Sequence, residues 1–205
     1  MAADFVVLLR HGRTASNHEG RWQGQLDVPL DEVGAGQAVA ASKALAALLE
    51  GLDGKVRLVS SDLSRASATA GALAETLGVD LELDPRLRET DAGNWQGLTA
   101  AEITAQWPEE YEAWRAGRDV PLGGAETRSQ AGARAAACIA ELEEAQDGGT
   151  LVCVSHGAAL RGAVCELAGL GWEATAAFEP IGNCHWVVMR RTVRGWRIVT
   201  YNQGV

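Results

Sequence analysis

The stretch FVVLLRHGRT, residues 5–14, joins five consecutive apolar residues to a cluster of charged and titratable ones. A short apolar run bounded by polar residues is typical of a strand buried on both faces of a parallel sheet. Charged side chains are costly to bury unless a partner neutralises them. The end of this strand, at Arg10 and His11, therefore either reaches solvent or builds a site that holds negative charge.

Strands and helices alternate along the rest of the chain. This alternation predicts an α/β fold, a three-layer sandwich whose mostly parallel sheet carries helices on both faces. The last two strands are joined by a turn at 192–195 and predict an antiparallel edge. We expect one domain over residues 1–205, with the irregular, tryptophan-rich segment at about 90–125 as a small inserted cap. Strands are predicted at 5–10, 56–61, 81–84, 150–155, 184–190 and 196–201, and helices at 31–50, 62–78, 99–106, 108–117, 126–146 and 158–169.

The bulk composition bounds the partners of the chain. The formal net charge of -9 argues against nucleic acid or an anionic membrane, because both require a basic face. No apolar run reaches the roughly 18 residues of a membrane span, and no signal peptide precedes Asp4. The cysteines form no C-x-x-C pair and stand in apolar contexts, as small buried hydrophobes do. These features predict a reduced, cytoplasmic protein, and they leave a small anionic ligand open.

Polar groups follow three of the predicted strands at 10–12 (RHG), 60–62 (SSD) and 155–157 (SHG), with Arg65 one helical turn after the second. In an open parallel sheet these turns share one edge, where ligands bind. Taken alone, Arg10 and His11 are more often a strand end that reaches solvent, His156 a capping or hydrogen-bonded loop histidine, and Arg65 a surface arginine of a helix. Together they predict a pocket with two arginines, two histidines and the N-terminus of the helix after Gly157, which suits a phosphoryl dianion.

Four segments, taken in chain order, carry a more specific pattern: LLRHGRTASN (8–17), SSDLSRA (60–66), RLRETDAGNWQGLT (86–99) and VSHG (154–157). Together they resemble the histidine phosphatase superfamily, which includes the cofactor-dependent phosphoglycerate mutases and many small-molecule phosphatases. The match covers nearly the whole chain. It implies the same α/β fold and a small phosphorylated metabolite as the substrate.

The resemblance also implies roles for individual residues. His11 would be the nucleophile that becomes a phosphohistidine. Arg10, Arg65 and His156 would bind the phosphoryl oxygens and offset charge in the transition state. Glu89 would protonate the leaving alcohol and then activate water. The implied substrate-binding residues are Asn17, Thr14, Gln23, Gly24 and Gly157.

These residue types suit the chemistry independently of the resemblance. A neutral imidazole is a good nucleophile at phosphorus, and arginines stabilise the charge of phosphoryl transfer. An alkoxide leaving group needs a proton donor, for which Asp91 is the alternative to Glu89. The sequence has no H-E-x-x-H and no phosphate-binding G-x-x-x-x-G-K-[ST] loop. We therefore expect no metal and no cofactor.

The stretch after Glu89 has no lysine and no paired arginines like those with which the family's mutases hold phosphoglycerate, so it resembles the phosphatase branch. Residues 22–38, 86–99 and 181–186 look closest to the actinobacterial glucosyl-3-phosphoglycerate phosphatases. GGAET (123–127) departs from the usual G-G-E-S. A broad-specificity phosphomonoesterase, a phosphoglycerate mutase and a non-catalytic phospholigand-binding protein stay open.

Two features leave interactions open. Tryptophans gather in the loops expected around the pocket, where they either pack the cap onto the sheet or form an aromatic platform for a bulky alcohol. The C-terminal hairpin offers an apolar edge strand that can pair between subunits, so we expect a homodimer. The tryptophans are Trp22, Trp95, Trp107 and Trp114.

Overall fold

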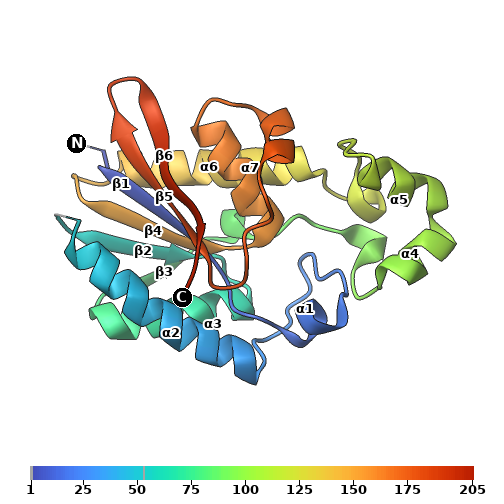
Figure 1. Ribbon diagram of the computed structural model, residues 1–205, viewed down its shortest axis with the longest axis horizontal. Coiled ribbons are helices and arrows are strands. Elements are labelled where there is room, and N and C mark those ends of the chain that lie inside the picture. The colour runs from blue at the N-terminus through green and yellow to red at the C-terminus, as the bar shows by residue number, and fades with distance from the viewer. Residues whose placement is uncertain (1, 53) are drawn as a thin grey trace.

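The structure is a computed structural model that describes residues 2–52 and 54–205. A sheet lies at its centre, with the strand order β3-β2-β4-β1-β5-β6 (Figure 1). The first four strands along the chain run parallel, while β5 is antiparallel to β1 and β6 to β5. The predicted sheet with its antiparallel edge is confirmed. The strands are β1 (Phe5–Arg10), β2 (Val56–Ser60), β3 (Leu81–Leu83), β4 (Thr150–Ser155), β5 (Trp186–Thr192) and β6 (Gly195–Gln203).

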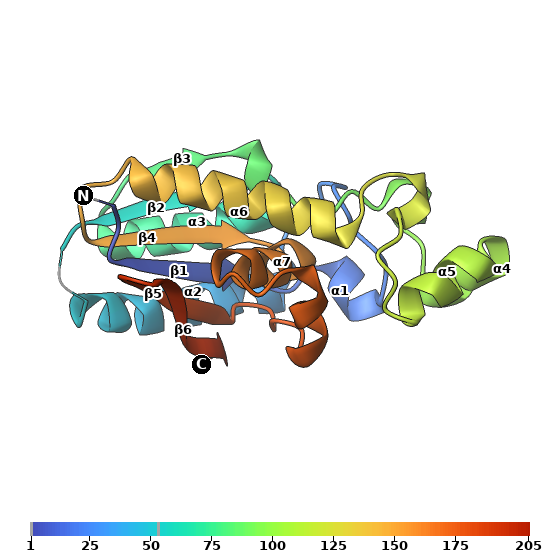
Figure 2. The ribbon, with the colours of Figure 1, turned by 90° about the horizontal axis from the view of Figure 1, so that it is seen from above.

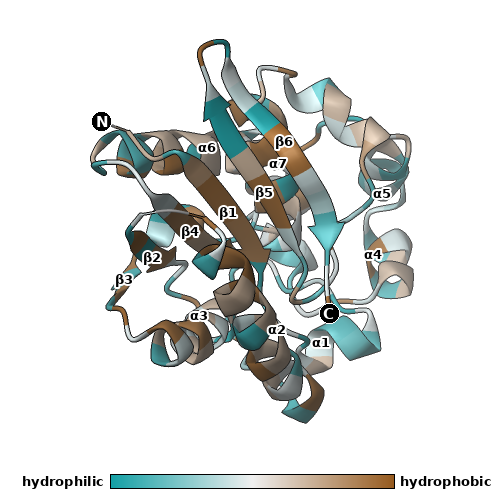
Figure 3. Cartoon of the chain, turned by 60° about the vertical axis from the view of Figure 1, so that its left-hand side comes forward, coloured by the Kyte–Doolittle hydropathy of each residue, from teal (hydrophilic) through white to brown (hydrophobic). Residues whose placement is uncertain are grey.

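Helices cover both faces of the sheet, as predicted. The helices α6 (Arg128–Glu144) and α7 (Gly157–Leu167) pack on one face, and α2 (Glu32–Glu50) and α3 (Ser64–Leu77) on the other (Figure 1). Hydrophobic residues are concentrated in β1 and β4, between these layers (Figure 3). Leu8 of β1 is fully buried, and burial of such a side chain stabilises the fold by about 1.5–3 kcal/mol.

The ends of these elements follow local chemistry. Asp31 caps α2 by accepting a hydrogen bond from the Gly34 amide at 2.7 Å. Gly78 ends α3 in the left-handed region, at φ 66°, as its position predicts. The predicted strand at 184–190 instead begins at Trp186, because Cys184 has a φ of 55° and donates its amide to the carbonyls of the β1 end.

The antiparallel edge of the sheet is the strand β6. The apolar strand β5 is not at the edge, because it lies between β1 and β6. Apolar and polar residues alternate in β6, with Trp196 and Ile198 packed towards the core and Val199 exposed. The apolar edge strand that we expected from the hairpin is therefore only half apolar.

A smaller lobe extends past the carboxyl ends of the parallel strands (Figure 2). It contains α4 (Ala100–Gln106) and α5 (Pro108–Arg115), and Trp95, Ile103 and Leu122 are buried in its own cluster. This lobe falls within the predicted cap at about 90–125. The organisation of the chain as one domain stays a prediction. The remaining short elements are α1 (Ala15–Glu19) and the 3-10 turns η1 (Pro85–Leu87), η2 (Gly93–Trp95), η3 (Leu122–Gly124) and η4 (Trp172–Ala177).

The tryptophans largely serve to pack the lobe. Trp95 is fully buried, and the ring of Trp22 meets the rings of Trp95 and Trp114 edge-on, with centroids 5.3 and 4.8 Å apart. Within the part of the chain that is described, no helix is long and apolar enough to cross a membrane.

Candidate active site

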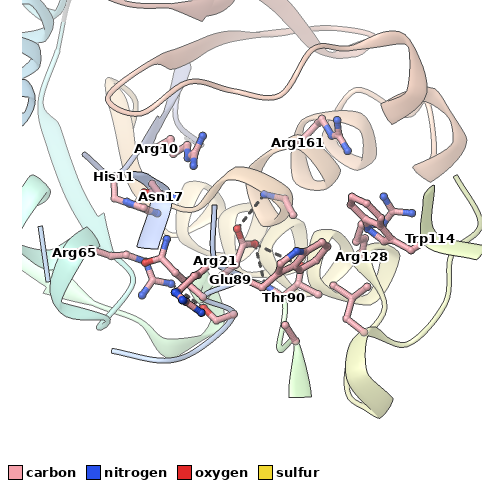
Figure 4. Close-up of a pocket in the computed structure, with 16 residues that line it drawn as sticks. Arg10, His11, Asn17, Arg21, Arg65, Glu89, Thr90, Trp114, Arg128 and Arg161 are labelled. Atoms are coloured by element: carbon pink, nitrogen blue, oxygen red, sulfur yellow. Dashed lines mark hydrogen bonds between the residues drawn. The ribbon is translucent and has the colours of Figure 1, made fainter. Parts of the chain in front are cut away.

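The three polar strand ends meet at one edge of the sheet. Arg10 stands beside Ser155 in the β1–β4 register, and the His11 amide donates to the Ser155 carbonyl at 3.0 Å. The Ser61 amide donates to the Val154 carbonyl at 2.9 Å. The strand ends border a cavity of about 210 Å³ between the sheet and the smaller lobe (Figure 4). The predicted residues that line it are Arg10, His11, Asn17, Gln23, Gly24, Arg65 and Glu89.

The His11 ring is held as a neutral imidazole. Its Nδ1 donates to the Gly12 carbonyl at 2.7 Å; a carbonyl oxygen can only accept, so this bond places the proton on Nδ1. Burial, and then the charges of Arg10 and Arg65, hold the pKa of His11 well below its ordinary value of 6.5. Nε2 is therefore unprotonated at neutral pH and available on the cavity side.

Arg10 and Arg65 bring positive charge to the same end of the cavity. Arg10 donates to the Ile181 carbonyl at 2.6 Å, and Arg65 donates to the carbonyls of Gly24 and Leu26 at 2.8 and 2.7 Å. Both have a buried Nε without a hydrogen-bond partner, and burial lowers the pKa of both guanidinium groups. Neither forms an ion pair within residues 2–52 and 54–205. Two fixed cations are thus left to an anionic ligand.

His156 lies directly behind the lining of the cavity. Its Nε2 forms a hydrogen bond with the Ser61 hydroxyl at 2.9 Å, and its buried Nδ1 has no partner. The ring centroid is 5.0 Å from that of His11. Burial, with smaller effects of His11, Arg65 and Arg10, holds the pKa of His156 well below its ordinary value. A neutral ring whose Nε2 accepts from Ser61 has a proton on Nδ1 to donate.

The carboxylate of Glu89 takes the place that we expected a phosphoryl group to occupy at the N-terminus of α7. Its Oε1 accepts from the amides of Thr90 and Ala159 at 2.9 and 3.0 Å, and its Oε2 accepts from Ala158 at 3.2 Å. Two amides of the first turn of α7 are therefore directed at the carboxylate. The expectation that this helix end is open to a ligand is wrong for those two amides.

Arg134 on α6 holds the backbone that carries Glu89. Its guanidinium donates to the carbonyls of Arg86, Arg88 and Glu89 at 2.7, 3.1 and 3.3 Å. It also pairs with Glu126 at 2.9 Å. One side chain thus fixes the segment that directs Glu89 into the cavity.

Asp91, the alternative acid, is directed elsewhere. Its side chain accepts from the Gly93 amide at 2.9 Å. It lines a separate surface hollow with Gln25 and Glu126 and does not line the cavity that contains His11. Of the two carboxylates, Glu89 is the one beside the candidate nucleophile.

The α1 segment orients two amide side chains. Oδ1 of Asn17 accepts from the Thr14 amide, the Thr14 hydroxyl and Asn183, at 3.2, 3.1 and 3.3 Å, which leaves Nδ2 to donate into the cavity. The Thr14 hydroxyl also lies 3.0 Å from Gln23 Oε1, so its single proton is shared in turn between Asn17 and Gln23. Thr14 is itself fully buried and does not line the cavity, so it positions Asn17 and Gln23.

The two predicted glycines, Gly24 and Gly157, allow neighbouring groups to pack closely against the backbone. Gly24 has a φ of 52°, and a Cβ there would lie 2.9 Å from the Ala92 amide nitrogen, so a side chain is excluded. Its carbonyl holds Arg65. Gly157 lies behind Arg10: a Cβ at Gly157 would stand 3.3 Å from the Arg10 Nε, and Gly157 does not line the cavity.

Arg128 and Arg161 also line the cavity, and neither was predicted from the sequence as a site residue. Arg128 is the first residue of α6, directly after the departure at 123–127. Arg161 lies four residues after Gly157 on α7, so Gly157 and Arg161 lie on the same face of that helix. This spacing from the S-H-G motif is the feature of the sequence that could have indicated Arg161 as a site residue. Arg21 lines the cavity as well, and so do Trp22 and Trp114, two of the tryptophans that the sequence places around the pocket.

The cysteines show no sign of reactivity. All are free and buried, and burial raises the pKa of the Cys138 and Cys184 thiols to about 12. Among the described residues, no group of three or more histidine, cysteine, aspartate or glutamate side chains is arranged to hold a metal ion. The potential chemistry is thus concentrated around His11 and Glu89.

Comparison with known proteins decides the family. The sequence model of the "Histidine phosphatase superfamily (branch 1)" matches residues 6–204. The chain belongs to this superfamily. The resemblance noted in the sequence and the predicted fold are therefore confirmed.

Named relatives within the superfamily include phosphatases and mutases. A glucosyl-3-phosphoglycerate phosphatase of Mycobacterium tuberculosis (strain CDC 1551 / Oshkosh) is 41% identical over 197 residues, covering 91% of this chain and 85% of the relative. A probable phosphoglycerate mutase GpmB of Salmonella paratyphi C (strain RKS4594) is 35% identical, covering 80% of this chain and 75% of the relative. The solved structure of mycobacterial glucosyl-3-phosphoglycerate phosphatase complexed with VO3 superimposes with a TM-score of 0.87 at 37% identity, covering 98% of this chain and 100% of that one.

Proposed function

We propose that this protein is a phosphatase that hydrolyses a small phosphomonoester through a phosphohistidine on His11. One observation carries the proposal: the neutral Nε2 of His11 lies beside Arg10 and Arg65, two arginines that each have a buried Nε and no carboxylate partner. A nucleophile beside fixed positive charge suits phosphoryl transfer, in which electrostatic stabilisation supplies most of the catalysis.

The first half-reaction transfers the phosphoryl group to the enzyme. Nε2 of His11 attacks phosphorus, the N–P bond forms, and the P–O bond to the alcohol breaks. Glu89 gives a proton to the departing oxygen. We assign that proton to Oε2, because it accepts a single amide at 3.2 Å whereas Oε1 accepts two.

The second half-reaction restores the enzyme. The Glu89 carboxylate removes a proton from a water molecule, whose oxygen attacks phosphorus. The N–P bond breaks, inorganic phosphate leaves, and His11 is again neutral. Splitting hydrolysis into these two steps avoids direct attack of water on the ester.

Donors around the nucleophile bind the phosphoryl oxygens in both steps. Arg10 and Arg65 provide charged N–H groups, the partnerless Nδ1 of His156 provides a neutral one, and Nδ2 of Asn17 provides another. Such preorganised donors need no rearrangement as negative charge develops. Gln23 and Gly24 complete the substrate site at the same end of the cavity.

A sugar ester of phosphoglycerate is the substrate that we propose. The support is the identity of 41% to a glucosyl-3-phosphoglycerate phosphatase across most of both chains. A phosphoglycerate mutase is the second candidate, favoured by the 35% identity to a probable mutase. A mutase would return the phosphoryl group to the substrate, whereas a phosphatase releases it to water.

Release of inorganic phosphate in the presence of a chelator tests the proposal. The substrates are an aryl phosphate, 3-phosphoglycerate and glucosyl-3-phosphoglycerate, and the proteins are wild type, His11→Ala and His18→Ala. His18 is the matched control because it is exposed and does not line the cavity. We expect His11→Ala to lose roughly a thousand-fold or more in rate, and His18→Ala to retain the wild-type rate. Activity that survives His11→Ala, or that disappears in the chelator, would contradict the proposed mechanism.

The results also separate the alternatives. Glucosyl-3-phosphoglycerate hydrolysed far faster than the aryl phosphate would support a dedicated enzyme, and similar rates a broad phosphomonoesterase. Interconversion of 2- and 3-phosphoglycerate without phosphate release would identify a mutase. Binding of all three compounds without any turnover would identify a phospholigand-binding protein.

We also propose that the enzyme acts in the cytoplasm, as a homodimer, without a metal, nucleic acid or membrane as partner. The net charge of -9 and the free, buried cysteines support this proposal. The exposed edge of β6 supports the dimer. Sedimentation equilibrium tests it directly, with twice the chain mass expected and a monomer at micromolar concentration contradicting it.

A further inference from the structure

The short segment before β5 crosses the end of β1 that carries the proposed nucleophile. This segment, residues 181–185 (IGNCH), has no role in the reaction proposed above and is termed the 181–185 turn. The Cys184 amide donates to the carbonyls of Arg10 and His11, at 3.1 and 3.2 Å. The Arg10 amide donates in turn to the His185 carbonyl at 3.0 Å. The turn is therefore hydrogen-bonded to the backbone of two site residues.

The 181–185 turn is itself held in place. The His185 amide donates to the Gly182 carbonyl at 3.1 Å, which closes the turn, and the Gly182 amide donates to Oδ1 of Asn202 on β6 at 2.8 Å. Cys184 has a φ of 55°, a conformation that is strained for a residue other than glycine and persists only where surrounding contacts hold it. These contacts fix the turn between β1 and β6.

Asn183 connects the turn to two groups of the site. Its Nδ2 donates to the His11 carbonyl at 3.0 Å and to Oδ1 of Asn17 at 3.3 Å. An amide nitrogen carries two hydrogens, so both bonds form at once. His11 and Asn17 line the reaction cavity (Figure 4), whereas Asn183 lines a separate hollow with Gln37 and Ala40. Asn183 thus reaches both site residues from outside the cavity.

The bond to the His11 carbonyl fixes the backbone that carries the nucleophile. The carbonyl accepts from Asn183 and Cys184, and the His11 ring donates to the next carbonyl, that of Gly12. A rotation of the peptide between His11 and Gly12 would therefore move the ring. Phosphoryl transfer requires the attacking and leaving atoms to be nearly in line, so a small shift of the ring slows the reaction without weakening the binding of phosphate.

The bond to Asn17 fixes the orientation of a side-chain amide. Oδ1 of Asn17 also accepts from the amide and the hydroxyl of Thr14. The hydroxyl proton is shared with Gln23, so Asn183 is one of two N–H donors that hold this oxygen. With the oxygen engaged, Nδ2 of Asn17 is directed towards the phosphoryl group.

We infer that Asn183 is a positioning residue for phosphoryl transfer, which aligns His11 and Asn17 by hydrogen bonds from outside the cavity. This inference rests on the proposed function and adds to it a residue that contacts neither the substrate nor the reacting atoms. Loss of such a residue lowers the rate of the chemical step far more than it weakens ground-state binding.

Substitution of Asn183 tests the inference. Asn183→Leu removes the donor and keeps a side chain of similar size, whereas Asn183→Ala removes the donor without adding apolar bulk at this half-buried position. In a single turnover with an aryl phosphate, we expect the rate of aryl alcohol release to fall by roughly 10- to 100-fold in both variants. The Kd of inorganic phosphate, measured by calorimetry, should change by less than about 3-fold. Circular dichroism confirms that each variant is folded.

Asn94→Leu is the matched control. It makes the same substitution at an exposed residue of η2 whose side chain forms no hydrogen bond with any described residue and does not line the cavity. We expect this variant to match wild type in both the rate and the affinity for phosphate.

Vanadate provides a readout that does not depend on turnover. Vanadium accepts a fifth ligand, so vanadate can bond to Nε2 of His11 in the geometry of the transition state, whereas inorganic phosphate contacts only the groups that bind its oxygens. By calorimetry we expect Asn183→Leu and Asn183→Ala to weaken the binding of vanadate by roughly 10-fold or more. Asn94→Leu should bind vanadate as wild type does.

Several results would overturn the inference. One is a single-turnover rate within about 2-fold of wild type in the folded Asn183 variants. Another is a loss of phosphate affinity as large as the loss in rate, which would make Asn183 a binding residue. An equal loss in Asn94→Leu would also contradict it. If wild type releases no phosphate from any ester, the proposed function fails, and vanadate still tests the alignment: weaker binding confined to the Asn183 variants supports it, and unchanged binding overturns it.

Discussion

The carboxylate of Glu89 accepts a hydrogen bond from the backbone amide of Ala159, 3.0 Å away, in the first turn of α7. The same helix begins directly after His156 and carries Arg161 one turn after Gly157. One helix terminus thus fixes Glu89, the proposed acid, and His156, the proposed phosphoryl-binding residue, relative to one another. The partial positive charge of that terminus also stabilises the carboxylate.

Replacement of Glu89 by glutamine should separate proton transfer from binding. The amide keeps an oxygen for the α7 amides but cannot protonate a leaving group. We expect a loss of roughly 100-fold or more in kcat on an alkyl phosphate and a smaller loss on an aryl phosphate, since an aryloxide leaves with less need of a proton. Steady-state kinetics on both substrates measure the two losses.

Asp91→Asn is the matched control for Glu89→Gln, because Asp91 accepts the Gly93 amide and faces another hollow. It should keep near-wild-type rates on both esters. Equal losses on alkyl and aryl phosphates in Glu89→Gln, or a larger loss in Asp91→Asn, would assign the acid elsewhere. In Glu89→Gln, the loss of the negative charge at the N-terminus of α7 should lower the free energy of unfolding by no more than about 1 kcal/mol.

His11 should stay neutral at a pH at which an ordinary histidine is half protonated. Its native pKa lies well below 6.5, because burial and two arginines disfavour the imidazolium ion. In ¹⁵N NMR spectra we expect Nδ1 protonated and Nε2 unprotonated at pH 6.5 and some way below it. The signals are assigned by comparison with His11→Asn. A His11 signal that is half protonated at pH 6.5 would contradict the geometry described here.

The free energy of unfolding should depend on pH through two buried histidines, His11 and His156. His11 and His156 both have native pKa values well below 6.5, whereas in the unfolded chain they take up protons near that pH. The unfolded state therefore binds more protons, and the free energy of unfolding falls as the pH falls below about 6.5. Urea unfolding at pH 7.5 and 5.5 measures the change. The fall should be smaller in His156→Asn.

Arg134 should act on catalysis through the position of Glu89. Its bonds to the carbonyls of Arg86, Arg88 and Glu89 hold the segment that carries the acid. In Arg134→Gln we expect kcat on an alkyl phosphate to fall by roughly 10-fold, and kcat on an aryl phosphate to fall much less. A purely structural role would lower both equally. Glu126→Gln, which removes the ion pair but keeps the carbonyl bonds, should have the milder effect.

Much of the sheet and of the reaction centre could be predicted from the sequence. The apolar run before Arg10 and the run before His156 are typical of buried strands, and parallel strands bring their carboxyl ends together. The segments at 8–17 and 154–157 are specific enough to indicate the family. The register of β1 and β4 confirms that these two strand ends lie side by side.

The parts that could not be predicted depend on distant contacts. The α7 terminus resembles an open anion site until Glu89, far from it in sequence, is seen to occupy it. The stretch after Glu89 has no paired arginines, and this absence favoured a phosphatase over a mutase. The structure nevertheless brings Arg128 of α6 and Arg161 of α7 to the cavity, so the absence of arginines directly after Glu89 does not by itself separate the two activities.

Detection of a phosphoryl group on His11 tests the central claim most directly. Glu89→Gln is mixed with an aryl phosphate, quenched within milliseconds in alkali, which preserves phosphohistidine, and analysed by peptide mass spectrometry. Aryl phosphates should still form the intermediate in this variant, while its hydrolysis, which needs Glu89 as a base, is slowed. We predict one added phosphoryl group on the peptide containing His11, absent from the double variant with His11→Ala. An unmodified peptide in a variant that still releases the aryl alcohol would contradict the proposed mechanism.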